Sequence, residues 1–510
     1  MALLKGFSKR FGSFRAGTPD VPRDRHGAGD TPCAMPDPPS ADPRTDNGVL
    51  YMSNEHERSR HGRSTAARTA WAALTATVTS GALALAGCAP GSPAANPTAS
   101  GEVSLKLTSD KITIKIQDET GFPVSDDLAK EFTKQHPNVT FKVVRDSFAN
   151  LTANAPRLMA STNAPDLIRL PTLGDSVKDG LLTNLDPYFK GFGWDKFSAG
   201  QLAASRMSGK GVRGEGSLYQ LGLGYSVTGI YVNQKYAKRL GLSGAPATIG
   251  ELEQWMAKAK AAKILPVQIG MQDGVGTFAL QALINQYGNK SDLVDWMFNK
   301  SDASFDTAAS LKGTTAFKKW ADAGYFPDDV NAINYTTMVS NFQAGKGLLM
   351  FDGNWDAAGT DKAMGQGAAT FVPVPPAAGG GKYVAMGAAN SFSIPAKAKH
   401  ADAAAFFLNW IHTDAKARQI VVDVTGASPG GDPARQLPKA KAGSLIEQAL
   451  KVSSEVAADN GFVDFMANTT SGIYAGAFQP YEQRLLTRRM EPKAFTAAIQ
   501  QYYEKELAGA

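Results

Sequence analysis

Cysteine is almost absent from this chain, which has Cys33 and Cys88 among its 510 residues. A mature protein that begins at Cys88 has no second cysteine, so it forms no internal disulfide and depends on burial of its core for stability. An exported protein of this size can fold in that way. The same scarcity excludes multi-cysteine zinc sites and catalytic thiols after residue 88.

Histidine is also scarce, and the common catalytic motifs are missing. Only His136, His400 and His412 follow residue 88, none stands at metal-ligand spacing from another, and we expect each to be structural. The sequence contains no H-E-x-x-H and no Walker A motif. Residues 209–214 match G-x-G-x-x-G but lead into a turn and a strand instead of a helix, so they do not indicate a nucleotide site. No cofactor and no metal is therefore predicted.

Charge of one sign is not in excess. The chain carries 53 basic and 47 acidic residues, for a net charge of +6. It has no basic run interleaved with aromatic residues, so nucleic acid is not an expected partner.

The first informative feature of the sequence is an export signal. Residues 52–87 combine arginines, an uncharged apolar run and small residues before a cut site, as a secretory signal peptide does. The run is close to the lower limit of roughly 17–25 residues for a membrane span, but it is rich in Ala, Thr and Gly and would insert weakly. Cys88 ends the sequence L-A-G-C, which resembles a bacterial lipobox. The resemblance implies lipidation of Cys88 and a membrane-tethered protein on the extracellular face.

The segments around this signal have no periodic pattern. Residues 1–51 are rich in Pro, Arg, Asp and Gly, which indicates either that translation starts at Met52 or that the segment is a disordered extension. Residues 88–109 begin with small residues and proline and are expected to form a flexible tether.

From residue 110 onward, strand and helix patterns alternate and predict an α/β protein, with a mainly parallel sheet in its first part. Strands are expected at residues 111–116, 139–144, 166–170, 229–233, 265–270 and 347–351. Helices are expected at residues 126–135, up to 160, 248–263, 278–287, 292–298, 307–321 and 492–507. A capping box, Thr248 with Glu251, opens the helix at 248–263.

The order of several short motifs resembles the family 1 extracellular solute-binding proteins of ABC importers. The segments that carry the resemblance are residues 132–139, 164–167, 182–188, 219–222 with 229–233, 248–252, 342–350, 353–355 and 371–375. Gly222 departs from the family, which usually has proline there.

The resemblance implies a two-lobed periplasmic-binding-protein-like fold with an inter-lobe hinge and a ligand cleft. Lobe 1 would comprise residues 110–224 and about 388–430, and lobe 2 about 229–386 and about 431–510. It further implies a monomeric, non-enzymatic receptor that captures a carbohydrate, a di- or oligosaccharide, by closure of the cleft and delivers it to ABC permease subunits in the membrane.

A sugar presents flat C–H faces and many hydroxyl groups, so its site needs aromatic plates together with carboxylates and amides. Trp355 lies with Asp352 and Asn354 in a polar loop after a buried strand. In the family this tryptophan often stacks on a sugar ring. The alternative roles are core packing for Trp355 and turn capping for the other two.

Further ligand-binding candidates follow from position. Tyr225 and Asn390 lie at expected crossings between the lobes. Glu119 ends the first strand, and Gln272 and Asp273 follow the strand expected at 265–270, where strand ends in an α/β sheet face a crevice.

Other functions stay open at this point. The same fold binds other solutes, such as peptides, polyol phosphates or siderophores. An anchored glycoside hydrolase requires two carboxyl groups about 5–9.5 Å apart across one cleft. A module that senses a ligand for a membrane kinase is a further alternative.

Overall fold

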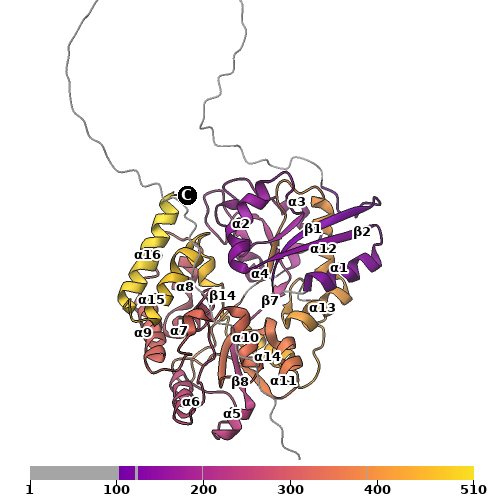
Figure 1. The fold of residues 1–510 in the computed structure, drawn as a ribbon. Coiled ribbons are helices and arrows are strands. Elements are labelled where there is room, and N and C mark those ends of the chain that lie inside the picture. The colour runs from indigo at the N-terminus through magenta and orange to yellow at the C-terminus, as the bar shows by residue number, and fades with distance from the viewer. Residues whose placement is uncertain (1–102, 121–123, 198, 388, 433, 510) are drawn as a thin grey trace, which may run out of the picture. The chain divides into compact units, whose positions relative to one another are not determined.

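The computed structural model describes residues 103–120, 124–197, 199–387, 389–432 and 434–509 (Figure 1). By its internal contacts the chain divides into Met1–Cys88 and Ala89–Ala510. The predicted extension, signal peptide and lipidated Cys88 lie outside the described residues. Within the described part, no helix combines the length and apolar character that a membrane span needs.

The first lobe is built on a five-stranded sheet in the order β2-β1-β3-β12-β6. Its strands are β1 (Ile112–Glu119), β2 (Val139–Asp146), β3 (Leu167–Arg169), β6 (Gln220–Gly222) and β12 (Ser391–Ser393). β1 runs parallel to β2 and β3, whereas β12 runs antiparallel to β3 and β6. The sheet is therefore mixed, and the prediction of a mainly parallel sheet is corrected. Both antiparallel ladders involve β12, which enters from a much later part of the chain.

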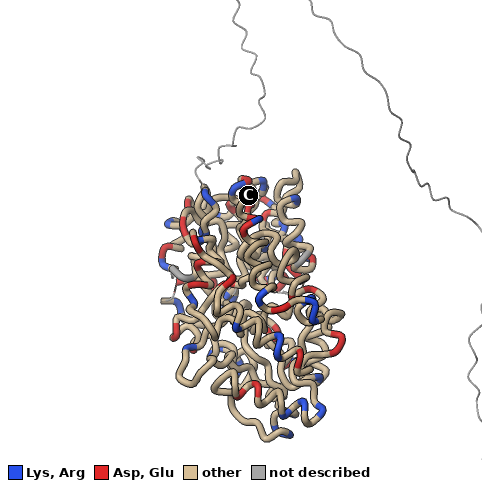
Figure 2. The backbone as a smooth tube through the Cα atoms, turned by 90° about the vertical axis from the view of Figure 1, so that its left-hand side faces the viewer, with Lys and Arg blue, Asp and Glu red and all other residues tan. Residues whose placement is uncertain are grey.

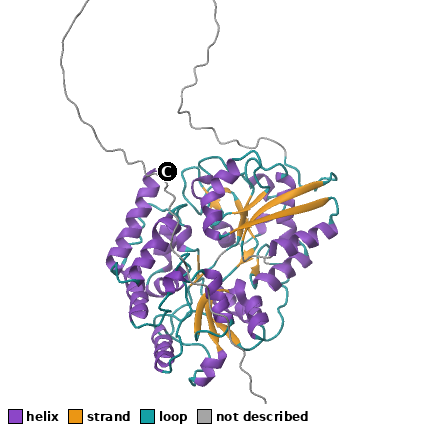
Figure 3. Cartoon of the chain, viewed as in Figure 1, coloured by secondary structure: helices purple, strands orange, loops and turns teal. Residues whose placement is uncertain are grey.

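Helices cover this sheet and share a core with it (Figure 3). They are α1 (Val124–Gln135), α2 (Phe148–Ala160), α3 (Asp186–Phe189), α4 (Ala199–Ala203), α12 (Ala401–Thr413) and α13 (Ala415–Thr425), with the short turns η1 (Gly174–Ser176) and η2 (Trp194–Lys196). Phe132 of α1 lies at the centre, with ring centroids 5.1 Å from both Phe407 and Trp410 of α12. α12 follows β12, so this late segment completes the first lobe.

The second lobe has an antiparallel sheet in the order β10-β8-β9. Its strands are β8 (Thr228–Asn233), β9 (Leu349–Gly353) and β10 (Ala369–Val372). Short paired strands complete the chain: β4 (Arg206–Met207) with β5 (Ser217–Leu218), β7 (Gly224–Tyr225) with β13 (Ser428–Pro429), and β11 (Ala385–Met386) with β14 (Phe462–Val463).

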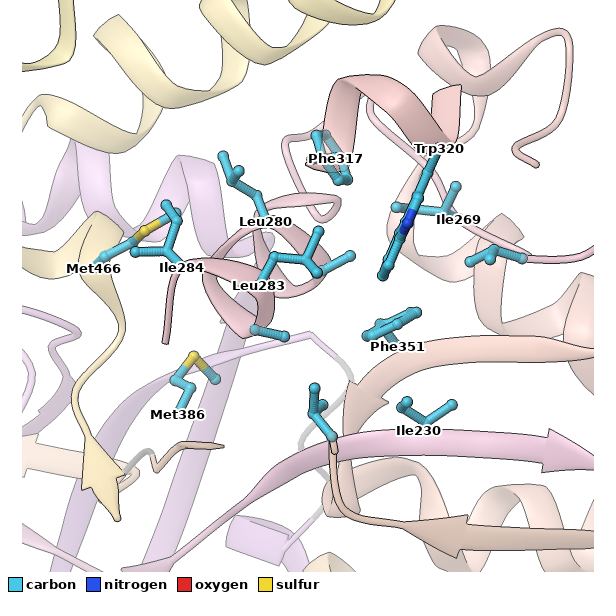
Figure 4. Close-up of a cluster of buried hydrophobic side chains, with 14 of the residues drawn as sticks. Ile230, Ile269, Leu280, Leu283, Ile284, Phe317, Trp320, Phe351, Met386 and Met466 are labelled. Atoms are coloured by element: carbon cyan, nitrogen blue, oxygen red, sulfur yellow. The ribbon is translucent and has the colours of Figure 1, made fainter. Parts of the chain in front are cut away.

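Most helices belong to the second lobe. They are α5 (Gln234–Arg239), α6 (Ile249–Ala261), α7 (Thr277–Tyr287), α8 (Lys290–Met297), α9 (Ala308–Asp322), α10 (Tyr335–Gln343), α11 (Ala357–Met364), α14 (Leu445–Ala458), α15 (Gln479–Leu486) and α16 (Pro492–Gly509), with the turns η3 (Val330–Ala332), η4 (Asn354–Asp356), η5 (Met466–Asn468) and η6 (Tyr474–Phe478). Their core joins side chains from α7, α9 and the sheet (Figure 4). In it, the rings of Trp320 and Phe351 lie 5.8 Å apart.

Local sequence signals account for several element boundaries. The predicted capping box is confirmed: the Thr248 hydroxyl accepts from the amide of Glu251, and the Glu251 carboxylate accepts from the amide of Ala247. Helix α6 follows directly. The helices expected at 278–287 and 307–321 are confirmed as α7 and α9 within one or two residues.

The strand expected at residues 265–270 is wrong. The segment is extended, but it makes only one bridge, between Val267 and Leu349 of β9. Pro266 has no amide hydrogen to donate, and the amide of Val267 donates to the carbonyl of Tyr325. The ladder beside β9 therefore does not extend.

The chain passes between the two sheets more than once. β6 leads through β7 to β8, and β11 leads back to β12. After α13, β13 pairs with β7, and α14 then packs on β10. The exact lobe boundaries stay a prediction.

Basic and acidic positions are interspersed along this part of the chain (Figure 2).

Candidate functional site

Trp355 lies where the two lobes meet. It follows β9 in the turn η4, it is half-buried, and it packs against core side chains of both lobes. Its ring meets that of Phe278 at 5.7 Å in an edge-to-face arrangement. A Cβ atom added at Gly353 would overlap Cζ3 of the indole, so only glycine leaves room for this ring. The tryptophan is therefore held from several sides.

A hydrogen-bond chain fixes the polar edge of this indole. Nε1–H of Trp355 donates to the hydroxyl of Tyr335 at 2.6 Å. That hydroxyl hydrogen-bonds the carboxylate of Asp356 and lies 3.5 Å from Oδ2 of Asp352. Tyr335 was not predicted from the sequence, since it starts α10 and lies 20 residues before Trp355 in the chain.

Asp352 was predicted to bind ligand, but it lies at the buried end of this series of hydrogen bonds. It is fully buried, and its Oδ1 accepts from the amide of Gly353 at 2.8 Å. Burial raises the pKa of Asp352 well above its usual range, and the neighbouring Asp356 adds to the effect. Burial also raises the pKa of Asp356, while hydrogen bonds from Tyr335 and Asp352 oppose the change. Asp352 is therefore linked to Trp355 through the hydroxyl of Tyr335.

Asn354 joins segments that run between the lobes. It is fully buried, its Oδ1 accepts from the amide of Val227 at 2.9 Å, and its Nδ2 donates to the carbonyl of Gly426 at 2.6 Å. Both ends of the amide are occupied. These contacts favour a structural role at the crossings over the predicted ligand contact.

On the side of lobe 1, the carboxyl end of β1 presents acidic groups. Asp118 is buried, and it accepts from Nε of Arg169 at 2.5 Å and from the hydroxyl of Ser125. Glu119 comes next in the chain. Burial raises the pKa of Glu119 to about 7, with Arg169 lowering it and Asp118 raising it. The guanidinium pairs with Asp118, and Glu119 stays partly protonated at neutral pH.

Tyr474 faces lobe 1 from η6 in lobe 2. Its ring meets that of Phe148 in α2 edge to face at 5.5 Å, and its hydroxyl donates to the carbonyl of Asp273 at 2.6 Å. Burial raises the pKa of Tyr474 well above 10, and Asp273, Glu482 and Glu119 add to the effect. Glu119 and Asp273 therefore lie near one phenol, although they belong to different lobes. The sequence analysis identified neither Tyr474 nor Phe148.

Gln272 and Asp273 lie beside α10 and α15. The carbonyl of Gln272 accepts from Nε2 of Gln479. The side chain of Gln272 is exposed. Oδ2 of Asp273 accepts from the amide of Tyr335 at 2.9 Å. Its other carboxylate oxygen is buried and has no hydrogen-bond partner among the described residues.

The predicted residues at the crossings are linked to each other. Asn390 has a positive φ of 46°, and its Nδ2 donates to the hydroxyl of Ser226 at 2.7 Å. Tyr225 precedes this serine, and its ring lies 6.2 Å from that of Phe462. The two crossings therefore contact one another beside the ring of Tyr225.

Carboxyl groups and the G-x-G-x-x-G segment are of the kinds that serve catalysis in other proteins. No group of three potential metal ligands occurs among the described residues. Asp352 and Asp356 both face the hydroxyl of Tyr335. In the G-x-G-x-x-G segment, Arg213 is buried and pairs with Asp464 of lobe 2 at 2.5 Å.

Two surface grooves on lobe 2 are separate from these residues. One, of about 680 Å³, runs between α6 and α9, and the other, of about 480 Å³, lies at the end of α7. None of the predicted ligand-binding residues lines either groove. The candidate site described above therefore does not coincide with either groove.

Comparisons with known proteins agree with this architecture. The model of the bacterial extracellular solute-binding protein family matches residues 118–417. No curated protein sequence matches the chain.

Similar solved structures include a chitin oligosaccharide binding protein, with 19% identity and a TM-score of 0.63 over 76% of this chain and 95% of that one. The GacH receptor of Streptomyces glaucescens, solved unliganded and with acarbose, has 18% identity and a TM-score of 0.62 over 78% and 98%. The maltodextrin-binding domain MalE of Bdellovibrio bacteriovorus, bound to maltotriose, has 16% identity and a TM-score of 0.62 over 78% and 100%.

At these identities the solved structures establish the fold, and the predicted two-lobed periplasmic-binding-protein-like architecture is confirmed. The family model covers more than half of the sequence. The chain therefore belongs to the bacterial extracellular solute-binding protein family.

Proposed function

We propose that this protein is a receptor that binds a carbohydrate between its lobes, closes around it and delivers it unchanged to an ABC importer. The observation that carries the proposal is Trp355, a half-buried indole held in place by hydrogen bonding and in contact with core side chains of both lobes. An aromatic plate at such a position suits the C–H face of a sugar ring, and a ligand there would touch both lobes at once.

Polar groups near the plate suit sugar hydroxyls. Glu119 comes from lobe 1, and Asp273 contributes a buried oxygen without a partner among the described residues. The proposed ligand-facing side chains are Trp355, Tyr225, Glu119, Asn390, Gln272 and Asp273, together with Phe148 and Tyr474. Asp352 and Asn354 are proposed to hold the turn that carries Trp355 in place and not to contact the ligand. The boundaries of the two lobes are proposed as the sequence predicts them.

The family implies an extracellular or periplasmic location. We further propose that the protein acts as a monomer, anchored by a lipid on Cys88, which would hold the receptor near the permease that it serves. The lipobox sequence at residues 85–88 supports this anchor.

A thermal-shift screen of residues 89–510 against mono-, di- and oligosaccharides tests the function. A sugar at 100 times its Kd should stabilise the protein by about 2.7 kcal/mol. Trp355→Ala should abolish the shift. Trp410→Phe, a conservative change in the core of lobe 1, should retain it.

Recovery of the sugar unchanged after incubation would support a receptor, whereas cleaved sugar would establish the hydrolase alternative. No shift with any sugar would refute the carbohydrate assignment and favour another solute in the same fold.

A further inference from the structure

We propose that Tyr335, backed by Asp352 and Asp356, is the positioning residue that fixes Trp355 as a ligand-stacking plate. This inference rests on the proposed function, because it takes Trp355 to stack on a ligand. The contacts that position the indole are present in the chain without a ligand. Tyr335 does not need to touch the sugar, because it acts through the indole.

The first step concerns the indole. Trp355 has a single polar group, Nε1–H, and this group can only donate. Its partner is the Tyr335 hydroxyl at 2.6 Å. Gly353 lies directly under the benzenoid edge of the ring, and Phe278 meets the ring at 62°. These contacts limit the ring, and the hydrogen bond to Tyr335 favours one rotation of it.

The second step concerns the phenol. While the Tyr335 hydroxyl accepts from the indole, its own hydrogen is directed to the carboxylate of Asp356. Oδ2 of Asp352 lies 3.5 Å from the same hydroxyl, whereas its Oδ1 accepts from the amide of Gly353. A chain of this kind gives each group one orientation, because reversing one hydrogen bond would leave a buried polar group without a partner.

The third step concerns the backbone of Tyr335. Its amide donates to Oδ2 of Asp273 at 2.9 Å, and Asn334 caps the same helix start by accepting from the amide of Thr337 at 2.8 Å. The phenol is therefore anchored at both ends: through the helix N-terminus to the loop at Asp273, and through its hydroxyl to the carboxyl pair. A movable tyrosine could not hold the indole, and this one is restrained.

Tyr231 supplies a matched control. It is a buried tyrosine in β8, the strand that pairs with β9, and its hydroxyl donates to the carbonyl of Gly353 at 2.8 Å and not to the indole. Tyr231→Phe and Tyr335→Phe each remove one buried hydroxyl. Only the second should release Trp355.

The test has one arm without ligand and one with it. In 15N-indole NMR spectra of the protein without sugar, the signal of Trp355 is identified by its loss in Trp355→Phe. Hydrogen exchange of this indole should be about tenfold faster in Tyr335→Phe, the scale of one hydrogen bond, and unchanged in Tyr231→Phe.

In the second arm, binding of maltose, maltotriose, raffinose, galactose and chitobiose is measured by calorimetry. Tyr335→Phe should weaken binding about tenfold in the parent background and should have no further effect in Trp355→Phe, which keeps an aromatic ring but has no N–H for the tyrosine to hold. A full loss in both backgrounds, or unchanged indole exchange in Tyr335→Phe, would overturn the positioning role. If no sugar binds while the exchange responds as expected, the proposed function fails and the positioning of the indole stands.

Discussion

Glu119 gives a prediction about pH that the structure makes quantitative. Burial raises the pKa of this carboxyl group from its ordinary value of 4.5 to about 7. Between these two values the folded protein keeps the proton that the unfolded chain has lost, so the free energy of unfolding falls as pH rises. The resulting loss of unfolding free energy is complete at pH values above the raised pKa and absent at pH values below the ordinary one. A shift of this size corresponds to about 3 kcal/mol.

Glu119→Gln removes the titration and keeps the shape of the side chain. The variant should match the parent in stability near pH 4 and exceed it by up to about 3 kcal/mol near pH 8. Urea unfolding of both proteins at several pH values measures this difference directly. Glu504→Gln, at an exposed glutamate on α16, serves as the control and should leave the pH profile unchanged. A difference between Glu119→Gln and the parent that is constant across this range would refute the reasoning.

Three further changes test other parts of the account. Arg213→Met leaves the carboxylate of Asp464 without its buried partner from lobe 1 and should lower the free energy of unfolding in urea by about 3–5 kcal/mol. Arg206→Met removes a more exposed ion pair and should lower it by about 1 kcal/mol or less. Equal losses would contradict a buried ion pair at Arg213. Gly353→Ala places a methyl group against the indole of Trp355, so it should change the tryptophan fluorescence and weaken sugar binding, and unchanged spectra would be inconsistent with this packing. Burial lowers the pKa of His412 to about 4, so the folded protein resists a proton that the unfolded chain accepts below its ordinary value of 6.5. His412→Gln removes this titration, so the stability of the variant relative to the parent should rise by about 3 kcal/mol as pH drops between these values, and a relative stability that does not change with pH would contradict the assignment.

The sequence predicted the features that depend on local pattern. The capping box at Thr248, the helices α7 and α9 and the strands β1 and β2 follow from residues close together in the chain. The polar turn that carries Trp355 could also be found, because it directly follows an apolar strand.

The contacts that define the site could not be predicted in this way. Tyr335 reaches Trp355 from a different helix, and Tyr474 meets Phe148 across more than 300 residues of sequence. No local pattern records such a pairing. Asn354 shows the same limit, because its residue type and turn fit a ligand contact as well as the buried hydrogen bonds that it makes.

The central claim is that a sugar draws the two lobes together. Because no cysteine follows Cys88, single cysteines can be placed at the exposed Lys134 in α1 and Lys258 in α6 and labelled without background in residues 89–510. The distance between the labels is measured with and without a sugar that stabilises the protein. The account predicts a shorter distance with sugar in the parent and no change in Trp355→Ala. A sugar that binds tightly and leaves the distance unchanged would contradict closure as the mechanism of capture.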